Sequence, residues 1–372
     1  MKLVVFGLTI SSSWGNGHAT LWRGLCRALA RHGHQIVFFE KDVPYYATNR
    51  DMVAIPNGKL VLYDTWDSIR HRAKAELADA DAAMVTSYCP DGIEATDLVL
   101  DTPKAVRTFY DLDTPVTLSK LQAREPLNYV GSRGLREFDL VLSYTGGGAL
   151  DKLQSELGAQ RVAPLYGHVD PDVHRPAAPM AHYGSDLSYL GTYAADRQAA
   201  LQRLFIDSAA RRPKQRFLIG GAQYPDDFPW QPNIHFVRHL PPAEHPAFFS
   251  SSRLTLNVTR QAMAEMGWCP SGRLFEASAC EVPLLSDDWE GLDRFFDPGH
   301  EILIAKTTED AVAALDLSDA ELSRIARASR ERTMAEHTSE HRARELEALL
   351  AGAKSTSSAS SISGQPTAMM EA

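Results

Sequence analysis

An arginine and a glutamate, Arg273 and Glu276, stand three residues apart in the segment from Pro270 to Ser286. On a helix this spacing places both side chains on one face. A guanidinium is the usual clamp for a diphosphate, and a carboxylate accepts hydrogen bonds from ribose or hexose hydroxyls. One short helix could therefore hold both parts of a nucleotide sugar, although an exposed Arg–Glu ion pair would use the same spacing.

A second candidate site is the loop of Gly15, Asn16, Gly17 and His18, between an expected strand and an expected helix. Glycines there let backbone N–H groups approach a ligand, and a helix N-terminus favours negative charge. His18 could position an acceptor hydroxyl or phosphates, or act as a general base; a capping or packed histidine is the alternative. Asp111, at the end of another expected strand, could orient a hydroxyl or cap the next helix.

The second half of the chain holds further candidates for phosphate binding, each directly after an expected strand or at the start of a helix. They are Gly191, Thr192, Tyr193, Asn257, Arg260 and Ser271. Backbone N–H groups at such positions suit a phosphate. Two guanidiniums, those of Arg260 and Arg273, would converge there and exceed what an exposed, solvated face requires.

The elements that must position these residues begin with a βαβ pattern. Strands are expected at 3–8 and 35–40 around an amphipathic helix at 19–31, with Gly33 at the helix end. Further strands are expected at 60–63, 82–87, 105–110 and 140–143, separated by helical patterns such as 69–78 and 146–157. This alternation is typical of a doubly wound α/β domain.

A second α/β series starts at Leu187, and two such halves form a cleft between them. Its strands are expected at 187–190, 216–220, 234–237, 254–257, 283–286 and 301–305. The predicted organisation is an N-terminal Rossmann-like domain at 1–165, a Pro-rich linker at 166–186, a C-terminal Rossmann-like domain at 187–335, a helix at 336–351 and a Ser-rich disordered tail at 352–372. The long helical region should break near His337.

Composition limits the class of protein. The 372 residues, 44% of them hydrophobic, suffice for two domains with cores, and a net charge of −9 argues against nucleic acid as the main partner. Cys26, Cys89, Cys269 and Cys280 are scattered without a C-x-x-C pair, so we expect reduced thiols, a cytoplasmic protein and no structural metal. The apolar run at 3–10 resembles a first strand more than a signal peptide, and no stretch approaches the roughly 20 apolar residues of a transmembrane segment.

The pattern Arg273-x-x-Glu276-Ala-x-Ala-x-x-x-Pro283 resembles the donor-binding motif of GT-B glycosyltransferases. From Met1 to about Leu350 the chain also resembles the CgeB-like (spore maturation protein) glycosyltransferases. The matching stretches are 6–8, 15–18, 109–115, 188–193 and 257–260. This resemblance implies a GT-B fold related to glycosyltransferase family 4, with two Rossmann-like domains facing across a cleft and a last helix that crosses back to the first domain.

The resemblance also implies an activity, the transfer of a sugar from a nucleotide diphosphate donor on the C-terminal domain to an acceptor hydroxyl on the N-terminal one. No cofactor or metal is expected beyond this co-substrate, because basic side chains and helix dipoles neutralise the phosphates. The Asp111-x-Asp113 pair would then not hold manganese, as such pairs do in GT-A enzymes. The sequence leaves open the base (UDP, TDP or GDP), the sugar, the acceptor (glycan, lipid, metabolite or protein) and the oligomeric state.

Particular roles follow from the same resemblance. Arg260 and Arg273 would stabilise the leaving diphosphate, and Glu276 would hold a donor hydroxyl. The loop that touches the transferred sugar would be Trp289, Glu290 and Gly291, although Trp289 could instead only pack in the cleft wall.

The stereochemical course stays open because one position departs from the family pattern. Family 4 carries two glutamates with seven residues between them; Glu276 matches the second, but Trp268 stands at the first. A retaining reaction, which the family implies, would pass the acceptor proton to the leaving phosphate. An inverting reaction would need a base from the N-terminal domain, first His18 and then Asp111.

Two alternatives belong to other classes. A catalytically inactive nucleotide-sugar-binding or scaffold protein would fit Trp268, and also Glu281, which stands where the family usually has glycine and would cost about 1 kcal/mol in a left-handed conformation. A dinucleotide-dependent oxidoreductase would use the Gly17 loop with Glu40 as the ribose acid. Its loop is, however, about seven residues too long, and Thr20 takes the place of the third small residue.

Overall fold

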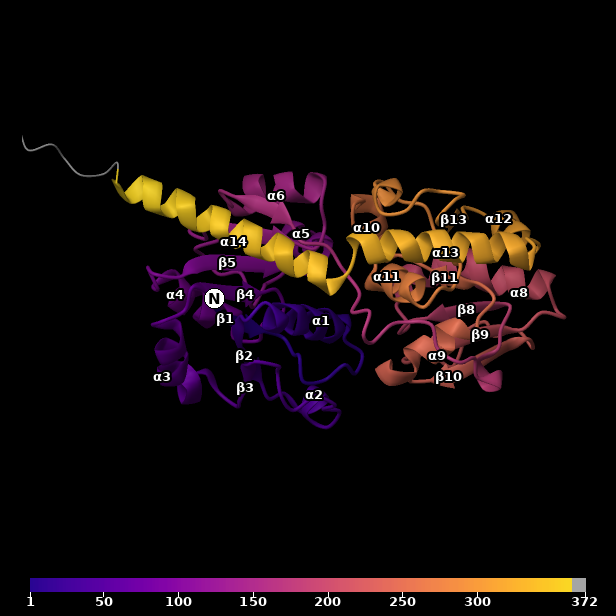
Figure 1. The fold of residues 1–372 in the computed structure, drawn as a ribbon, viewed down its shortest axis with the longest axis horizontal. Coiled ribbons are helices and arrows are strands. Elements are labelled where there is room, and N and C mark those ends of the chain that lie inside the picture. Colours follow the sequence, from indigo (N-terminus) through magenta and orange to yellow (C-terminus); the bar gives the residue numbers. More distant parts are fainter. Residues whose placement is uncertain (363–372) are drawn as a thin grey trace, which may run out of the picture.

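The computed structural model describes residues 1–362, which form two α/β domains side by side (Figure 1). The N-terminal domain has a seven-stranded parallel sheet in the order β3-β2-β1-β4-β5-β6-β7. Its strands are β1 Lys2–Gly7, β2 Gln35–Lys41, β3 Gly58–Tyr63, β4 Ala82–Thr86, β5 Val106–Asp111, β6 Leu140–Ser143 and β7 Val162–Pro164. Its helices are α1 Gly17–Arg31, α2 Pro44–Ala47, α3 Trp66–Leu77, α4 Gly92–Leu100, α5 Thr114–Gln122 and α6 Gly148–Leu157.

The strands of this sheet are apolar on both faces because helices cover both. In β1, Val4 and Phe6 belong to one core cluster, whereas Leu3 and Val5 belong to the cluster on the opposite face. Successive strand residues point to opposite faces, so a continuous apolar run is what a doubly covered parallel strand requires.

The C-terminal domain repeats this design with a six-stranded parallel sheet in the order β10-β9-β8-β11-β12-β13. Its strands are β8 Leu187–Leu190, β9 Phe217–Gly221, β10 Ile234–Arg238, β11 Thr255–Asn257, β12 Leu284–Ser286 and β13 Leu303–Ile304. Its helices are α7 Gln198–Leu201, α8 Asp207–Arg211, α9 His245–Ser250, α10 Gln261–Met266, α11 Gly272–Ala279, α12 Thr308–Leu315 and α13 Asp319–Glu336. Short turns of other helical type are η1 Ala181–Tyr183, η2 Ala195–Arg197, η3 Gln202–Ile206, η4 Pro242–Glu244 and η5 Leu292–Arg294.

The last helix joins the two domains. Helix α13 ends before His337, where the sequence predicts a break, and α14 (Ser339–Ile362) then crosses to the N-terminal domain (Figure 1). Leu346 and Leu350 of α14 share a core cluster with Leu25 of α1. The crossing helix that the resemblance implies is therefore present.

The predicted end of this helix at 351 is wrong, because α14 continues through Ile362. The residues around Gly352 include Ala351 and Ala353, and a single glycine costs only about 1 kcal/mol in a helix interior. No proline interrupts the chain before Pro366. The rest of the predicted tail, 363–372, lies outside the described residues.

Each predicted strand is present, and β7 is an additional one that the sequence did not reveal. Between β7 and β8 the described chain forms the turn η1 and two isolated β-bridges, at Val169 and Ser185, and the linker stays a prediction. None of the helices within residues 1–362 combines the length and apolarity that crossing a bilayer requires.

Candidate functional site

A cleft of about 880 Å³ lies between the domains. It is lined by loops that follow β1 and β5 in the N-terminal domain, by loops that follow β8, β9 and β11 in the C-terminal domain, and by the start of α11. Ligand sites of open α/β sheets form at these carboxyl ends of strands.

The predicted site residues divide into two groups by their position. Those that line the cleft are Gly15, Gly17, His18, Gly191, Thr192, Arg260, Ser271, Arg273 and Glu276. Those outside its lining are Asp111, Tyr193, Asn257, Trp289, Glu290 and Gly291. The cleft therefore brings together the glycine loop, the two arginines and the glutamate, but not the predicted sugar loop.

His18 lies in the first turn of α1, whose N-cap is Asn16. The Asn16 side chain accepts a hydrogen bond of 3.0 Å from the His18 N–H. The ring Nε2 of His18 lies 3.2 Å from Oδ2 of Asp113, while Nδ1 is buried without a partner. A carboxylate on one ring nitrogen fixes the ring and leaves the other nitrogen as the proton acceptor when Nε2 carries the proton.

Asp113, rather than Asp111, is the carboxylate of the D-x-D segment that lines the cleft. The Asp111 side chain is fully buried below it and accepts hydrogen bonds from Thr117 Oγ1 (3.1 Å) and from the Asp113 N–H (3.2 Å). Burial raises the pKa of Asp111 to about 6. In this arrangement Asp111 supports the loop that carries Asp113.

Arg273 projects into the cleft from the first turn of α11, which Ser271 caps. Its Nη1 donates to Asn257 Oδ1 at 3.2 Å, and its guanidinium lies 5.3 Å from the centre of the Tyr189 ring. Gly191 provides the room, since a Cβ there would lie 3.0 Å from Nη2 of Arg273. Asn257 thus orients the guanidinium from below the cleft surface.

Arg273 makes no salt bridge with any carboxylate of the described chain. Burial lowers its pKa, and the guanidinium of Arg197 contributes in the same direction. Arg197 also lines the cleft and donates to the Thr192 carbonyl (3.3 Å), and within residues 1–362 its buried Nε has no partner. Two guanidiniums without carboxylate partners therefore share one wall of the cleft.

Arg260 differs from these two arginines. Its Nε donates to Asp196 at 2.9 Å, in an ion pair whose arginine side chain is 38% exposed. Its charge is therefore already balanced, and a phosphate would have to compete with Asp196 for it.

Glu276 lies one turn after Arg273 on the same helix, within reach of two histidines from other segments. The ligand atoms of His174, His245 and Glu276 all lie within 4.8 Å of one another. Burial lowers the pKa of each histidine to about 4 and raises that of Glu276. Neutral imidazoles beside a carboxylate can orient it toward a sugar hydroxyl, and three such ligands could also hold a metal ion.

Glu290 and Gly291 pack against Trp268, and Trp289 is buried in a core cluster of the C-terminal domain, so none of the three lines the cleft. The Trp268 indole N–H donates to Glu290 Oε1 at 3.3 Å, and a Cβ at Gly291 would collide with the indole ring. A Cβ at Gly147 of the N-terminal domain would collide with the same ring. Trp268 therefore fills the contact between the domains at the position where family 4 has its first glutamate.

Glu40 does not have a free carboxylate for a ribose. It is fully buried and accepts hydrogen bonds from Thr9 Oγ1 (2.8 Å), the Ile10 N–H (2.8 Å), the Ser11 N–H (3.0 Å) and Ser11 Oγ (2.5 Å). These bonds hold the long loop after β1, so the geometry does not favour a dinucleotide site.

Four residues were not selected from the sequence: Asp113, Arg197 and His245, which line the cleft, and His174, which lies beside Glu276. For two of them a signal existed. Asp113 is the second acid of the D-x-D segment, and Arg197 stands one turn beyond the Gly191 loop. The two histidines come from the linker and from the start of α9, and no local pattern connects them with Glu276.

Comparison with known proteins identifies one protein family that resembles part of this chain. A family model described as glycosyl transferase-like matches residues 197–348, less than half of the chain, which include Arg197, Arg260, Arg273 and Glu276. A search of curated protein sequences finds no match.

Solved structures are similar over nearly the whole chain. The sucrose-phosphate synthase of Thermosynechococcus elongatus has a TM-score of 0.69 at 13% identity, with 96% of this chain and 100% of that one covered. Anabaena HepE, solved with UDP and glucose, has a TM-score of 0.66 at 12% identity over 95% and 100%. An alpha-glucosyltransferase solved with UDP and a 13-mer DNA has a TM-score of 0.67 at 13% identity over 94% and 99%.

These matches establish the fold class. The two parallel sheets and the crossing helix form the GT-B fold of glycosyltransferases, as the sequence predicts. More particularly, residues 197–348 in the C-terminal part of the chain are similar to the glycosyl transferase-like family model. The narrower resemblance to the CgeB-like family stays a prediction.

Proposed function

We propose that this protein is a glycosyltransferase that moves a sugar from a nucleotide diphosphate donor, bound on the C-terminal domain, to an acceptor hydroxyl presented by the N-terminal domain. The observation that carries this proposal is the pair of guanidiniums, Arg197 and Arg273, that share the cleft without a carboxylate partner among the described residues. The glycosyl transferase-like match over the same wall supports it.

The repulsion between the two guanidiniums favours a bound anion. Bringing two cations together inside a cleft is unfavourable unless an anion completes the site. A diphosphate supplies two or more negative charges with oxygens spaced for guanidinium N–H groups. Glu276, one turn further along α11, is then placed to accept from a hydroxyl of the same donor.

In the transfer step the acceptor oxygen bonds to the anomeric carbon while the bond from that carbon to the diphosphate oxygen breaks. Negative charge grows on the departing diphosphate, where Arg273 and Arg197 stabilise it. The acceptor proton passes to the leaving phosphate if configuration is retained, or to His18, held by Asp113, if it is inverted.

We propose retention as the course of the reaction, following the family 4 pattern at Glu276. Trp268 removes the first glutamate of that pattern, so the anomeric configuration of the product, read by NMR, is the direct test. An inverted product would instead assign the proton to His18.

UDP-glucose is the first donor to try, because two of the similar structures were solved with UDP and one of these with glucose as well. The acceptor class is open among glycan, lipid, metabolite and protein. Nucleic acid, which one similar protein was solved with, is disfavoured here by the net charge of −9. We also propose a cytoplasmic location, because the four cysteines are buried and form no disulfide, as is usual for proteins of a reducing compartment.

The experiment is a turnover assay with UDP-glucose, with hydrolysis to UDP as the readout until an acceptor is found. We expect Arg273→Ala and Glu276→Ala each to lower turnover by about 10²–10³-fold while circular dichroism shows folded protein. Arg211→Ala, at an exposed arginine paired with Glu309, is the matched control. Near-normal rates in both cleft variants would refute the site.

We also propose that transfer needs no metal, since the guanidiniums of Arg197 and Arg273 supply positive charge that can neutralise the diphosphate in place of a metal ion. EDTA should leave turnover unchanged. Loss of turnover in EDTA that manganese restores would contradict this and would point to the ligands of His174, His245 and Glu276.

A second candidate is a nucleotide-sugar-binding protein without turnover. Trp268, which fills the place of the first glutamate and contacts both domains, is the observation that favours it. UDP-sugar binding with no hydrolysis or transfer to any acceptor would establish this alternative.

A further inference from the structure

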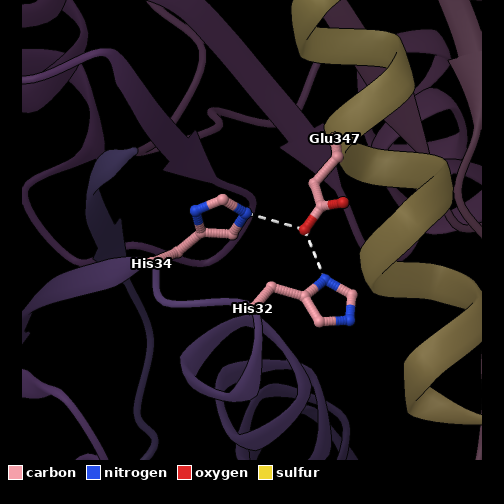
Figure 2. A group of neighbouring side chains, drawn as sticks. All are labelled: His32, His34 and Glu347. Atoms are coloured by element: carbon pink, nitrogen blue, oxygen red, sulfur yellow. Dashed lines mark hydrogen bonds and ion pairs between the residues drawn. The ribbon is translucent and has the colours of Figure 1, made fainter.

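Outside the cleft lining, three ligand-type side chains converge on one point (Figure 2). They are His32, His34 and Glu347, and their ligand atoms all lie within 4.8 Å of one another. Nδ1 of His32 lies 2.6 Å and Nε2 of His34 lies 2.7 Å from the same oxygen, Oε1 of Glu347. Two imidazoles and a carboxylate are the donor set that divalent zinc and similar transition metals prefer.

Rigid elements hold these three side chains in place. His32 caps the C-terminus of α1, and His34 immediately precedes β2, so Gly33, with φ of +78°, turns the chain between them. Glu347 comes from α14, whose neighbouring Leu346 is fully buried in the core that α14 shares with α1. The positions of the ligands are therefore set by the packing of the fold.

The outer ring nitrogens of the two histidines have different partners. Nε2 of His32 lies 2.6 Å from Glu340 Oε1, which can accept its proton. Nδ1 of His34 lies 3.2 Å from the amino group of Met1, which donates to it when charged, so this hydrogen bond must break or the amino group lose a proton before Nε2 of His34 can bind an ion. A carboxylate on the outer nitrogen of a histidine fixes the ring and raises the basicity of the inner nitrogen. The inner nitrogens, Nδ1 of His32 and Nε2 of His34, both point toward Oε1 of Glu347 (Figure 2).

We propose that His32, His34 and Glu347 bind a divalent transition metal of the zinc class, which fastens α14 to the turn between α1 and β2. Zinc lies about 2.0–2.2 Å from such ligands, so tetrahedral ligand atoms are about 3.3 Å apart. Each nitrogen needs to separate from the Glu347 oxygen by less than about 1 Å to admit the ion.

The site would be reversible. Its side chains are 18–29% exposed, so an ion can enter from solvent, and water takes the fourth position that the protein leaves open. Because α14 is the element that returns from the C-terminal domain, an ion here would stiffen the connection between the domains. The sequence predicts no structural metal because its cysteines are scattered. A site of this kind has no local sequence pattern, because His34 and Glu347 are 313 positions apart.

The test is calorimetric titration of zinc chloride into tag-free, chelator-treated protein. We expect one tightly bound ion per chain, bound at least tenfold more weakly by His34→Gln and by Glu347→Gln, and unchanged in His71→Gln, which replaces an exposed histidine. The melting temperature should rise with zinc in the wild type and not in the two site variants.

Equal zinc affinity in all four proteins, or no binding by the wild type, would overturn the proposal. If either site variant is unfolded by circular dichroism, anomalous diffraction at the zinc edge from wild-type crystals decides, and a peak anywhere but among these three residues counts against the site. Turnover in EDTA should also be measured on Glu347→Gln, which lacks a ligand of this site. If EDTA abolishes turnover in this variant as it does in the wild type, the metal is required for transfer itself and not at this site.

Discussion

The two walls of the cleft are built from the same parts, strand ends followed by helix starts, yet they differ in how their charges are balanced. On the N-terminal wall His18 is paired with Asp113, and in the same domain the buried Glu40 accepts four hydrogen bonds. On the C-terminal wall Arg197 and Arg273 have no carboxylate partner in the part of the chain that the structure describes. The charges of the first wall are therefore balanced within the described chain, whereas these two guanidiniums of the second wall are not.

This difference assigns the two parts of the proposed reaction. A diphosphate belongs on the wall with unbalanced positive charge, whereas a neutral hydroxyl belongs beside the His18–Asp113 pair, which can orient it or take its proton. The predictions below therefore separate donor binding from acceptor chemistry, starting with the largest effect.

Replacing His18 should damage turnover without damaging donor binding. We expect His18→Ala to lower turnover by about 10²-fold or more, whether the imidazole takes the proton or only positions the hydroxyl, and to leave the Kd for UDP unchanged. Steady-state rates and calorimetry measure the two quantities. A matching loss of UDP affinity would mean that both walls bind the donor.

Asp113→Asn sharpens this prediction, because it keeps the shape of the partner and removes its charge. We expect a smaller loss of turnover than in His18→Ala, with a changed pH profile. Identical rates in Asp113→Asn and wild type would contradict a role of the His18–Asp113 pair in transfer.

Replacing Arg197 should weaken the binding of UDP, which replacing His18 should not. Hydrogen bonds to charged groups contribute about 1.5–3 kcal/mol, so Arg197→Ala should bind UDP about 10- to 100-fold more weakly. Arg211→Ala is the exposed control. Unchanged UDP affinity in Arg197→Ala would show that its guanidinium is not part of the anion site.

The two histidines beside Glu276 should make stability depend on pH. Burial holds the pKa of His174 at about 4, below the ordinary value of 6.5, so between these values only the unfolded chain binds a proton. Stability is therefore full above pH 6.5 and is lost as the pH falls toward 4, by an amount on the order of 2–3 kcal/mol for this residue.

Thermal unfolding between pH 7 and 4 checks this effect. His174→Gln should flatten the dependence, whereas His71→Gln, at an exposed site, should not. Parallel curves for all three proteins would contradict the assignment.

The smallest effect concerns the ends of two helices, one in each domain. After α1 the left-handed position is occupied by Gly33, with φ of +78°, whereas after α11 it is occupied by Glu281, with φ of +59°, as the sequence predicts. Glu281→Gly should therefore raise the free energy of unfolding by about 1 kcal/mol without changing turnover. A lower stability, seen in chemical denaturation, would show that the contact of Glu281 with Arg330 outweighs the strain.

Much of the fold could be predicted because parallel strands covered on both faces are long apolar runs, as in β1 and β2. The strand β7 was missed because its three residues, ending in Pro164, carry no periodicity. The true length of α14 was missed because serine is a permissive helix residue when no proline follows.

The candidate site was only partly predictable. Helical spacing identified Arg273 with Glu276, since that relation is local. The absence of a carboxylate beside Arg197, or the placement of His174 and His245 beside Glu276, depends on segments far apart in the chain. In the proposed sugar loop at 289–291, Glu290 and Gly291 pack on Trp268, a contact that no local pattern reveals, and the role of the loop stays a prediction.

The measurement that tests the central claim most directly is calorimetric titration of UDP into wild-type protein, Arg273→Ala and Arg211→Ala in the presence of EDTA. We expect one UDP per wild-type chain, unchanged affinity in Arg211→Ala, and affinity about 10- to 100-fold weaker or lost in Arg273→Ala. Equal UDP affinity in all three proteins would contradict the claim that the unpaired guanidiniums of the C-terminal wall form the diphosphate site.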